Sequence, residues 1–258
     1  MKITAPARAS RARLTLAAGA ALALAGAALA TQTAAKTAGT PKGPIPDVTV
    51  RVEGLHGTLL QPTVVTLTAG SVSKGDAADS CSTLSALGAL QDATKGDWEG
   101  AWSESYREYF ITSILGTAYP QTASYYWAFW LDDKPASSGA CSVVPAQGSS
   151  ILFFPEYDGK SKSVAVPNVL GLSAPASALL GKPFTVLATS YANATGKPSP
   201  ARGVTLSAGS AHATTTSAGR ATLTLTKPGL VEIRGSAPNL VRDEVVICIH
   251  KLGAFCPR

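Results

Sequence analysis

Alternation of apolar and polar residues predicts that much of this chain forms β-strands. Val48, Val50 and Val52 alternate with polar residues, and the stretch 64–68 repeats the theme after a turn that contains glycine. Two such runs in succession predict a β-hairpin. By the same reasoning we expect three later strands, at 109–115, 124–131 and 151–154.

One helix is expected between the hairpin and these later strands. Leu84, Leu87 and Leu90 recur every three residues and therefore share a helical face, and Asp79-Ser80 offers an N-cap before them. The polar and aromatic segment 98–108 is interpreted as a connection without regular structure. One helix against a sheet predicts an α+β unit of β-grasp type.

The pattern changes after residue 162 to strands alone, separated by turns that carry Gly or Pro. Strand signals spaced about 10 residues apart are typical of an antiparallel sandwich. All four Trp and six of the seven Tyr lie between positions 98 and 157, so the composition changes near the same point. We therefore predict two domains, an α+β β-grasp-like domain at 47–158 and an all-β sandwich at 163–258.

The first 30 residues have the pattern of a secretory signal peptide. Four basic residues precede the apolar stretch 14–29, which ends in Ala28-Leu29-Ala30, a small-x-small cleavage pattern. A spanning helix needs about 20 apolar residues, and this stretch is shorter. Residues 31–46 are rich in Pro, Lys and Gly and predict a flexible leader. We expect a protein that is secreted or at the cell surface, without a membrane span after signal removal.

Charge is distributed unevenly along the chain. The net charge is +6, and the signal segment carries four of the basic residues. Residues 163–258 hold nine Lys and Arg against three acidic residues, spread singly. Such a basic domain could contact anionic cell-wall polymers weakly and in a salt-sensitive way, or its charges could simply be solvated. No nucleic-acid partner is expected.

The four cysteines of an exported chain predict two disulfides. Three pairings are open. We favour Cys81 with Cys141 and Cys248 with Cys256, because each of these bridges would lie within one predicted domain.

Sequence motifs for catalysis are missing. His56, His212 and His250 fall in different predicted elements, and no nucleophile motif or metal-binding spacing surrounds them. Asp132-Asp133 is the one close acidic pair near aromatic residues, and its place between strands favours a turn. We therefore expect no catalytic residues, no metal and no cofactor.

The strand at 124–131 carries aromatic residues on both faces, because successive side chains point to opposite sides of a strand. Trp127 and Phe129 belong to the more uniformly apolar side, which we assign to the core. Tyr126 and Trp130 then point outward.

We expect the outward rings to form an exposed aromatic patch together with two indoles of the 98–108 connection. Such a surface suits a small flat ligand, a glycan or a surface protein. The alternative is that the connection folds back and covers the rings. The predicted ligand-binding residues are Trp98, Trp102, Tyr126 and Trp130.

Two families resemble parts of the chain. The residues Tyr109–Gly116, Tyr125–Asp133, Gly139-Ala140-Cys141 and Ile151–Phe154 occur in an order that resembles the transcobalamin-like C-terminal domain, catalogued in bacteria as DUF4430. The segment 217–229 is similar to bacterial immunoglobulin-like domains of invasin type. These resemblances imply an extracellular ligand domain followed by an immunoglobulin-like domain. In cobalamin carriers the corresponding region helps to cover the corrinoid, but their large helical domain is absent here.

These inferences together predict a noncatalytic binding or display protein. One alternative is an extracellular carrier of a cobalamin-like or other small ligand, which requires a concave, partly apolar pocket. A second alternative is an extracellular enzyme of unrecognised type, which would need a cleft that holds Asp132 or Asp133.

Overall fold

The structure is a computed structural model, and it describes residues 46–119, 124–157 and 166–254. These residues form mostly β-strands, with one short helix in the described part. The predicted signal peptide (1–30), nearly all of the predicted leader (31–46) and the predicted domain boundary near 158–163 lie outside the described residues. Among the helices of the described segments, none has the length and apolar character needed to cross a membrane.

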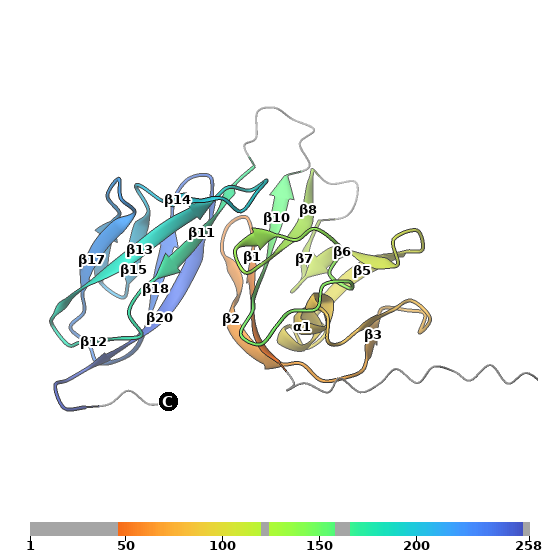
Figure 1. Cartoon of the computed structure of the whole chain (residues 1–258), viewed down its shortest axis with the longest axis horizontal. Helices are drawn as coiled ribbons and strands as arrows, with labels where there is room; N and C mark the ends of the chain where they lie inside the picture. The colour runs from red at the N-terminus through yellow and green to blue at the C-terminus, as the bar shows by residue number, and fades with distance from the viewer. Residues whose placement is uncertain (1–45, 120–123, 158–165, 255–258) are drawn as a thin grey trace, which may run out of the picture. The chain divides into compact units, whose positions relative to one another are not determined.

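A five-stranded sheet, which we call the N-terminal sheet, organises the first part of the chain (Figure 1). Its order is β2-β1-β10-β8-β9. The central pair β1–β10 is parallel and the other pairs are antiparallel. The hairpin predicted from the valine alternation is confirmed, since Val48 pairs with Val65. The strands are β1 (Asp47–Glu53), β2 (Thr58–Thr66), β8 (Tyr125–Leu131), β9 (Lys134–Pro135) and β10 (Ser150–Tyr157).

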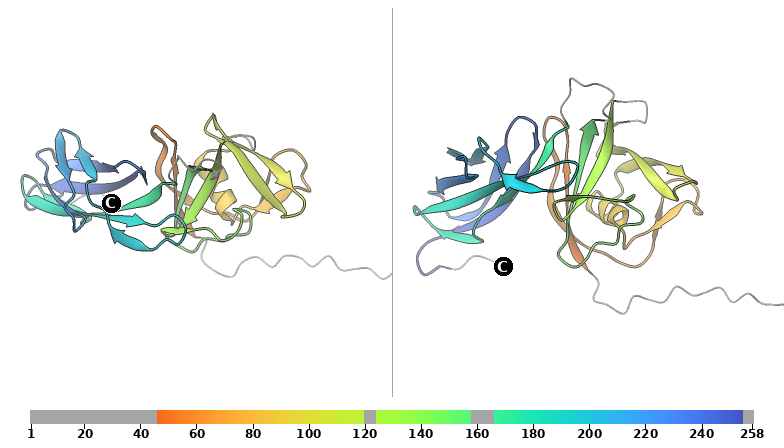
Figure 2. Two further views of the ribbon diagram at one scale, coloured as in Figure 1. Left: turned by 90° about the horizontal axis from the view of Figure 1, so that it is seen from above. Right: turned by 45° about the horizontal axis from the view of Figure 1, so that its top comes forward.

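Helix α1 (Ala86–Ala93) lies against one face of this sheet, as Figures 1 and 2 show. Its apolar side packs Leu87 and Leu90 into a core with β-strand residues such as Val50 and Phe153. The predicted N-cap was wrong. Residues 80–82 form a strand, and Ser85 caps the helix by accepting a hydrogen bond from the backbone N–H of Gly88.

Two small sheets complete the first part of the chain. The segment 98–108, predicted as an irregular connection, instead contains a strand that pairs antiparallel with the next one, from Trp98 opposite Ile114 to Ser103 opposite Glu108. A register shift after Glu99 breaks the alternation along this pair, which conceals the strand in the sequence. The strands are β3 (Ser71–Ser73) with β4 (Ser80–Ser82), and β5 (Trp98–Ser103), β6 (Glu108–Ile114) and β7 (Thr117–Ala118).

The C-terminal part consists of two five-stranded sheets around a common apolar core. Val186 and Leu223 from one sheet and Leu206 and Ile233 from the other belong to this core. This arrangement is consistent with the predicted all-β sandwich. The strands are β11 (Asn168–Ser173), β12 (Ser177–Leu179), β13 (Pro183–Tyr191), β14 (Pro198–Pro200), β15 (Thr205–Ala208), β16 (Ala211–Thr214), β17 (Arg220–Thr224), β18 (Gly229–Ser236), β19 (Leu240–Val241) and β20 (Asp243–His250).

The face of the N-terminal sheet opposite α1 is also covered. The strand register places Arg51, Leu152 and Trp130 in one row across β1, β10 and β8. Leu152 and Trp130 pack in an apolar cluster with Val169 and Val241 of the C-terminal part. The sheet is therefore apolar on both faces at its centre.

Ion pairs join the same two parts of the chain. Arg51 Nη2 lies 3.0 Å from Asp243 Oδ1, and Arg242 Nη2 lies 3.1 Å from Glu53 Oε2. Arg51 also pairs with Glu53, and it donates a hydrogen bond to the backbone carbonyl of Arg242. Because the side chains of Arg51 and Glu53 are buried, both charges are satisfied by partners rather than by water.

Candidate functional site

Two of the four predicted ligand-binding residues lie in or beside the core under α1. Trp98 is only 1% exposed, packs edge-on against Tyr109 at a ring distance of 5.4 Å, and donates from Nε1 to Gln91 Oε1 at 2.7 Å. Trp102 is half-buried and contacts the same Tyr109 ring at 5.1 Å. Trp98 is thus not part of an exposed patch.

The other two residues lie on β8. The assignment of Trp127 and Phe129 to the core is confirmed, since both pack against the cluster that contains α1. Trp130 points to the opposite face, as expected, but it is only 2% exposed because Val169 and Val241 cover it. The predicted exposure of Trp130 was wrong for this reason, while Tyr126 is half-buried. The structure therefore does not gather the four rings into one exposed patch, and their ligand-binding role stays a prediction.

A different feature brings Tyr126 and Trp130 together with a ring that the prediction missed. Both line a cavity of about 380 Å³ whose other aromatic lining includes Phe110 of β6, a half-buried residue. A second cavity of about 560 Å³ adjoins the first, since Tyr109, Phe110, Ser138 and Gly139 line both. We call the two adjoining cavities the Phe110 groove.

Polar groups on the rim of the Phe110 groove are mostly hydroxyls. The second cavity is lined by Tyr106, which is exposed, and by the serines 103, 137, 138 and 142. Lys and Arg do not occur among the lining residues, and the two carboxylates there are Glu108 and Glu156. The groove thus combines an aromatic floor with an almost uncharged hydroxyl rim.

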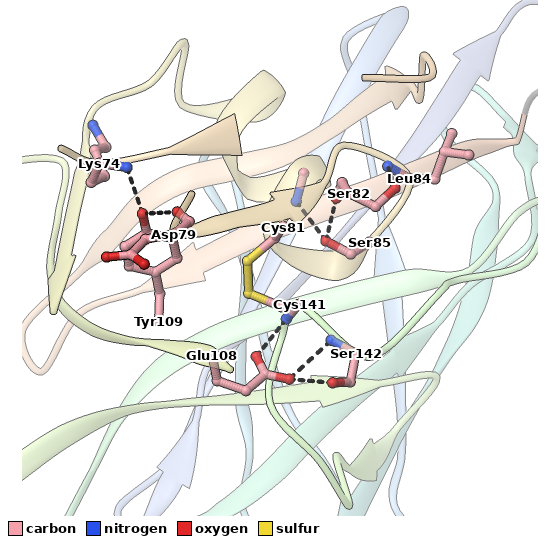
Figure 3. Close-up of a disulfide and its surroundings, with 11 residues drawn as sticks. Lys74, Asp79, Cys81, Ser82, Leu84, Ser85, Glu108, Tyr109, Cys141 and Ser142 are labelled. Carbon is pink, nitrogen blue, oxygen red and sulfur yellow. Dashed lines mark hydrogen bonds between the residues drawn. A yellow bond between two sulfur atoms is a disulfide. The ribbon is translucent and has the colours of Figure 1, made fainter. Parts of the chain in front are cut away.

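Glu108 does not offer a free carboxylate to a ligand. Its oxygens accept hydrogen bonds from the backbone N–H groups of Cys141 and Ser142, at 2.8 and 3.1 Å, and from the Ser142 hydroxyl (Figure 3). The contact is close, because a Cβ added to Gly139 would lie 2.3 Å from Glu108 Cδ. Glycine at position 139 therefore lets the loop approach the carboxylate.

The loop that walls the groove is tied at two more points. A disulfide joins Cys141 to Cys81 of β4, as predicted, with a Cα–Cα distance of 5.1 Å (Figure 3). The carbonyls of Ala140 and Val143 accept hydrogen bonds from the first two N–H groups of α1, which have no partner within the helix. The wall is thus fixed to β6, β4 and α1. The predicted partner of Cys248, Cys256, lies outside the described residues.

No catalytic constellation was found in the part of the chain that the structure describes. His56 precedes β2, His212 lies on β16 and His250 ends β20, so they are on separate elements. Asp132 and Asp133 form the turn between β8 and β9 with positive φ angles of 50° and 61°, as predicted. Asp132 accepts hydrogen bonds from the backbone N–H of Ser150 and the hydroxyl of Ser149, so it is engaged structurally. Within the same residues, no group of three or more His, Cys, Asp or Glu is arranged to hold a metal ion.

Comparison with known proteins supports part of the predicted resemblance. A family model described as a domain of unknown function, DUF4430, matches residues 83–154, which include most of the Phe110 groove. A candidate metal-binding protein from Ruminococcus gnavus ATCC 29149 is similar at 13% identity and a TM-score of 0.30, over 43% of this chain and 97% of that chain. Haptocorrin in complex with Cbi is similar at 22% identity and a TM-score of 0.33, over 43% of this chain and 25% of that chain. The search of curated proteins found no match.

Proposed function

We propose that this chain is an exported, noncatalytic binding protein whose Phe110 groove takes a small, flat ligand. The observation that carries the proposal is the pair of adjoining cavities around Phe110. Their combined lining is concave and aromatic, with a few polar groups, which is the usual character of small-molecule sites. Volumes of about 380 and 560 Å³ fall within the range of such sites.

The chemistry of the lining favours an uncharged ligand with an apolar face. Half-buried rings such as Phe110 and Tyr126 offer apolar area. The hydroxyls of Ser138 and Tyr106 can donate or accept hydrogen bonds at the edge of a bound ring. Because the Glu108 carboxylate is engaged by Cys141 and Ser142 of the wall loop, Glu156 is the remaining carboxylate, so a strongly cationic or anionic ligand has little to pair with.

Export is part of the proposal. The disulfide between Cys81 and Cys141 fits an oxidising, extracellular compartment, which agrees with the signal peptide expected at 1–30. The β-grasp-like assignment of the first part also belongs here. It is supported by the parallel β1–β10 pair between two antiparallel neighbours, with α1 on one face. The two-layered C-terminal part supports an immunoglobulin-like module that spaces or displays the binding part.

The proposal is tested by intrinsic fluorescence, because Trp127 and Trp130 line the groove. Purified protein is titrated separately with a corrinoid, with neutral oligosaccharides and with haem, whose two propionates make it the anionic contrast. We expect a saturable change in tryptophan emission with the corrinoid or with an oligosaccharide. A response to the corrinoid alone would favour the carrier alternative over a glycan-binding role.

Two variants make the titration specific. Phe110→Ala removes the ring shared by both cavities and should weaken binding at least ten-fold, while Leu230→Ala removes an equally apolar side chain that is exposed elsewhere. Unchanged affinity in Phe110→Ala, or no response to any probe in the wild-type protein, would contradict the proposal.

A further inference from the structure

A polar contact links β2 to the β18–β20 face of the C-terminal part. With its amide nitrogen turned toward the carboxylates, Gln61 of β2 donates to Glu244 Oε2 at 2.6 Å and to Glu232 Oε1 at 3.1 Å. Its amide oxygen then accepts from Arg234 Nη2 at 3.1 Å. One neutral side chain thus bridges two neighbouring carboxylates that come from different strands.

The two carboxylates share one arginine unequally. Arg234 Nε lies 2.5 Å from Glu232 Oε1, and Nη2 donates to Glu232 Oε2 at 3.1 Å. The same Nε is 3.6 Å from Glu244 Oε2. The Glu244 side chain is only 2% exposed, whereas that of Arg234 is 59% exposed. Glu244 is therefore a buried carboxyl whose nearby cation is committed to another acid.

These conditions favour the protonated form of Glu244. Burial, the hydrogen bond with Glu232 and the charge of Glu232 raise the pKa of Glu244 to about 8, with Glu53 adding to the effect and Arg51 opposing it. Burial by itself raises the pKa of Glu232. Hydrogen bonds with Glu244 and Arg234 outweigh burial, so the pKa of Glu232 is lowered below its ordinary value. The pair thus holds one proton, which resides on Glu244.

The charged groups around this pair come from every element packed against it. The contact from β2 is the neutral side chain of Gln61. The charged groups lie on β1, on β18, on the turn after β8 and on β20 itself. They are Arg51, Glu53, Asp133, Glu232, Arg234 and Asp243.

We infer that Glu244, Glu232 and Gln61 form a proton-dependent clasp that holds β2 against the β18–β20 face. In the closed state the Glu244 carboxyl donates its proton to Glu232, and Gln61 bridges both. When Glu244 releases this proton to solvent, three carboxylates (Glu53, Glu232 and Glu244) stand together, and their repulsion weakens the contact.

The direction of the pH effect follows from proton linkage. In an open state Glu244 would be hydrated and titrate near its ordinary pKa of 4.5, whereas the closed state keeps the proton up to a pKa of about 8. At any pH between these two pKa values, closing of the clasp is therefore coupled to the uptake of one proton by Glu244. The ratio of closed to open molecules should fall about ten-fold for each pH unit in this window, and should be constant above it.

The test measures the distance between the two parts of the full chain. Spin labels are introduced at Tyr106 and Leu230, which are both exposed. They are incorporated as encoded amino acids, so that the cysteines stay intact. Pulsed electron resonance at pH 5.5, 7.0 and 8.5 then gives the distance distribution. We expect a longer-distance population to grow as the pH rises in the wild-type background, and to be independent of pH in Glu244→Gln.

Matched variants decide the outcome. Glu99→Gln changes an acid that is 69% exposed and should keep the wild-type response. An unchanged distribution in the wild-type background, or the same response in Glu244→Gln, overturns the proposal. If Glu244→Gln does not fold, Gln61→Ala provides the test. Gln61 is exposed, so the Gln61→Ala variant should fold. It should show a larger open population than the wild type at pH 5.5. A distance distribution equal to that of the wild type at this pH would also overturn the proposal.

Discussion

Arg51 of β1 and Asp243 of β20 form an ion pair between the two parts of the chain, with Nη2 and Oδ1 3.0 Å apart. The same guanidinium lies 3.1 Å from Glu53, whose side chain is 1% exposed. Arg51 lies in the same row as Trp130 and Leu152. It thus supplies positive charge at the edge of an apolar contact, where unpaired carboxylates would be costly.

Replacing Arg51 by Met should destabilise the protein by about 3–5 kcal/mol, because it leaves buried carboxylates short of a partner. The free energy of unfolding in urea measures this loss. Glu99→Gln serves as the control, since the Lys74–Glu99 pair is at the surface with a 3.7 Å separation and should contribute less than about 1 kcal/mol. Equal losses in the two variants would show that the Arg51 pair is not specially important.

Loss of the Cys81–Cys141 bridge should lower stability by about 4 kcal/mol in the chain-entropy account, because the cysteines are 60 residues apart. The double variant Cys81→Ala with Cys141→Ala is compared with the wild type by denaturant unfolding without reductant. Emission titrations at low denaturant then show whether the wall loop still supports binding. A stability equal to that of the wild type would contradict the predicted contribution.

Substitution of Gly139 by Ala should cost about 1–3 kcal/mol through overpacking, because the new Cβ would lie 2.3 Å from Glu108 Cδ. The displaced loop should also weaken ligand binding in the Phe110 groove. Gly57→Ala is a matched control, since a Cβ there meets nothing within 4 Å. Thermal unfolding should separate the two variants, and similar melting temperatures would show that the loop relaxes freely around Glu108.

The stability of the whole chain should also depend on Glu244. The pKa of Glu244 is raised on folding from 4.5 to about 8, so its favourable contribution is fully present below pH 4.5 and is lost as the pH rises to about 8. Urea unfolding at several pH values should show a shallower decline in Glu244→Gln than in the wild type. Parallel pH profiles for the two proteins would exclude Glu244 as the titrating group.

Periodic patterns of apolar residues predicted those elements whose buried face can be recognised within a few neighbouring residues. Alternation at Val48, Val50 and Val52 identified β1, and the apolar side of β8 correctly assigned Trp127 and Phe129 to the core. Residues spaced to face one side of a strand or helix carry this information in their periodicity.

The burial of Trp130 could not be predicted in the same way. Its cover comes from Val169 and Val241, and nothing in the pattern around residue 130 indicates which distant strands lie opposite. Phe110 was missed for a related reason, since the groove depends on β6 and β8 belonging to different sheets. The one feature of the sequence that could have pointed to Phe110 is that the strand at 109–115 begins with two aromatic residues, Tyr109 and Phe110, which lie on opposite faces.

The apolar cluster around Trp130 limits how this protein can be divided for experiments. A fragment that ended at residue 157 would expose Trp130, Leu152 and Phe154 to water, since their cover comes from residues beyond that point. Surfaces of this kind promote aggregation. Shortened versions for crystallisation or ligand screening should therefore retain β11 and β19, and a soluble sample is better obtained by trimming the ends than by cutting the middle.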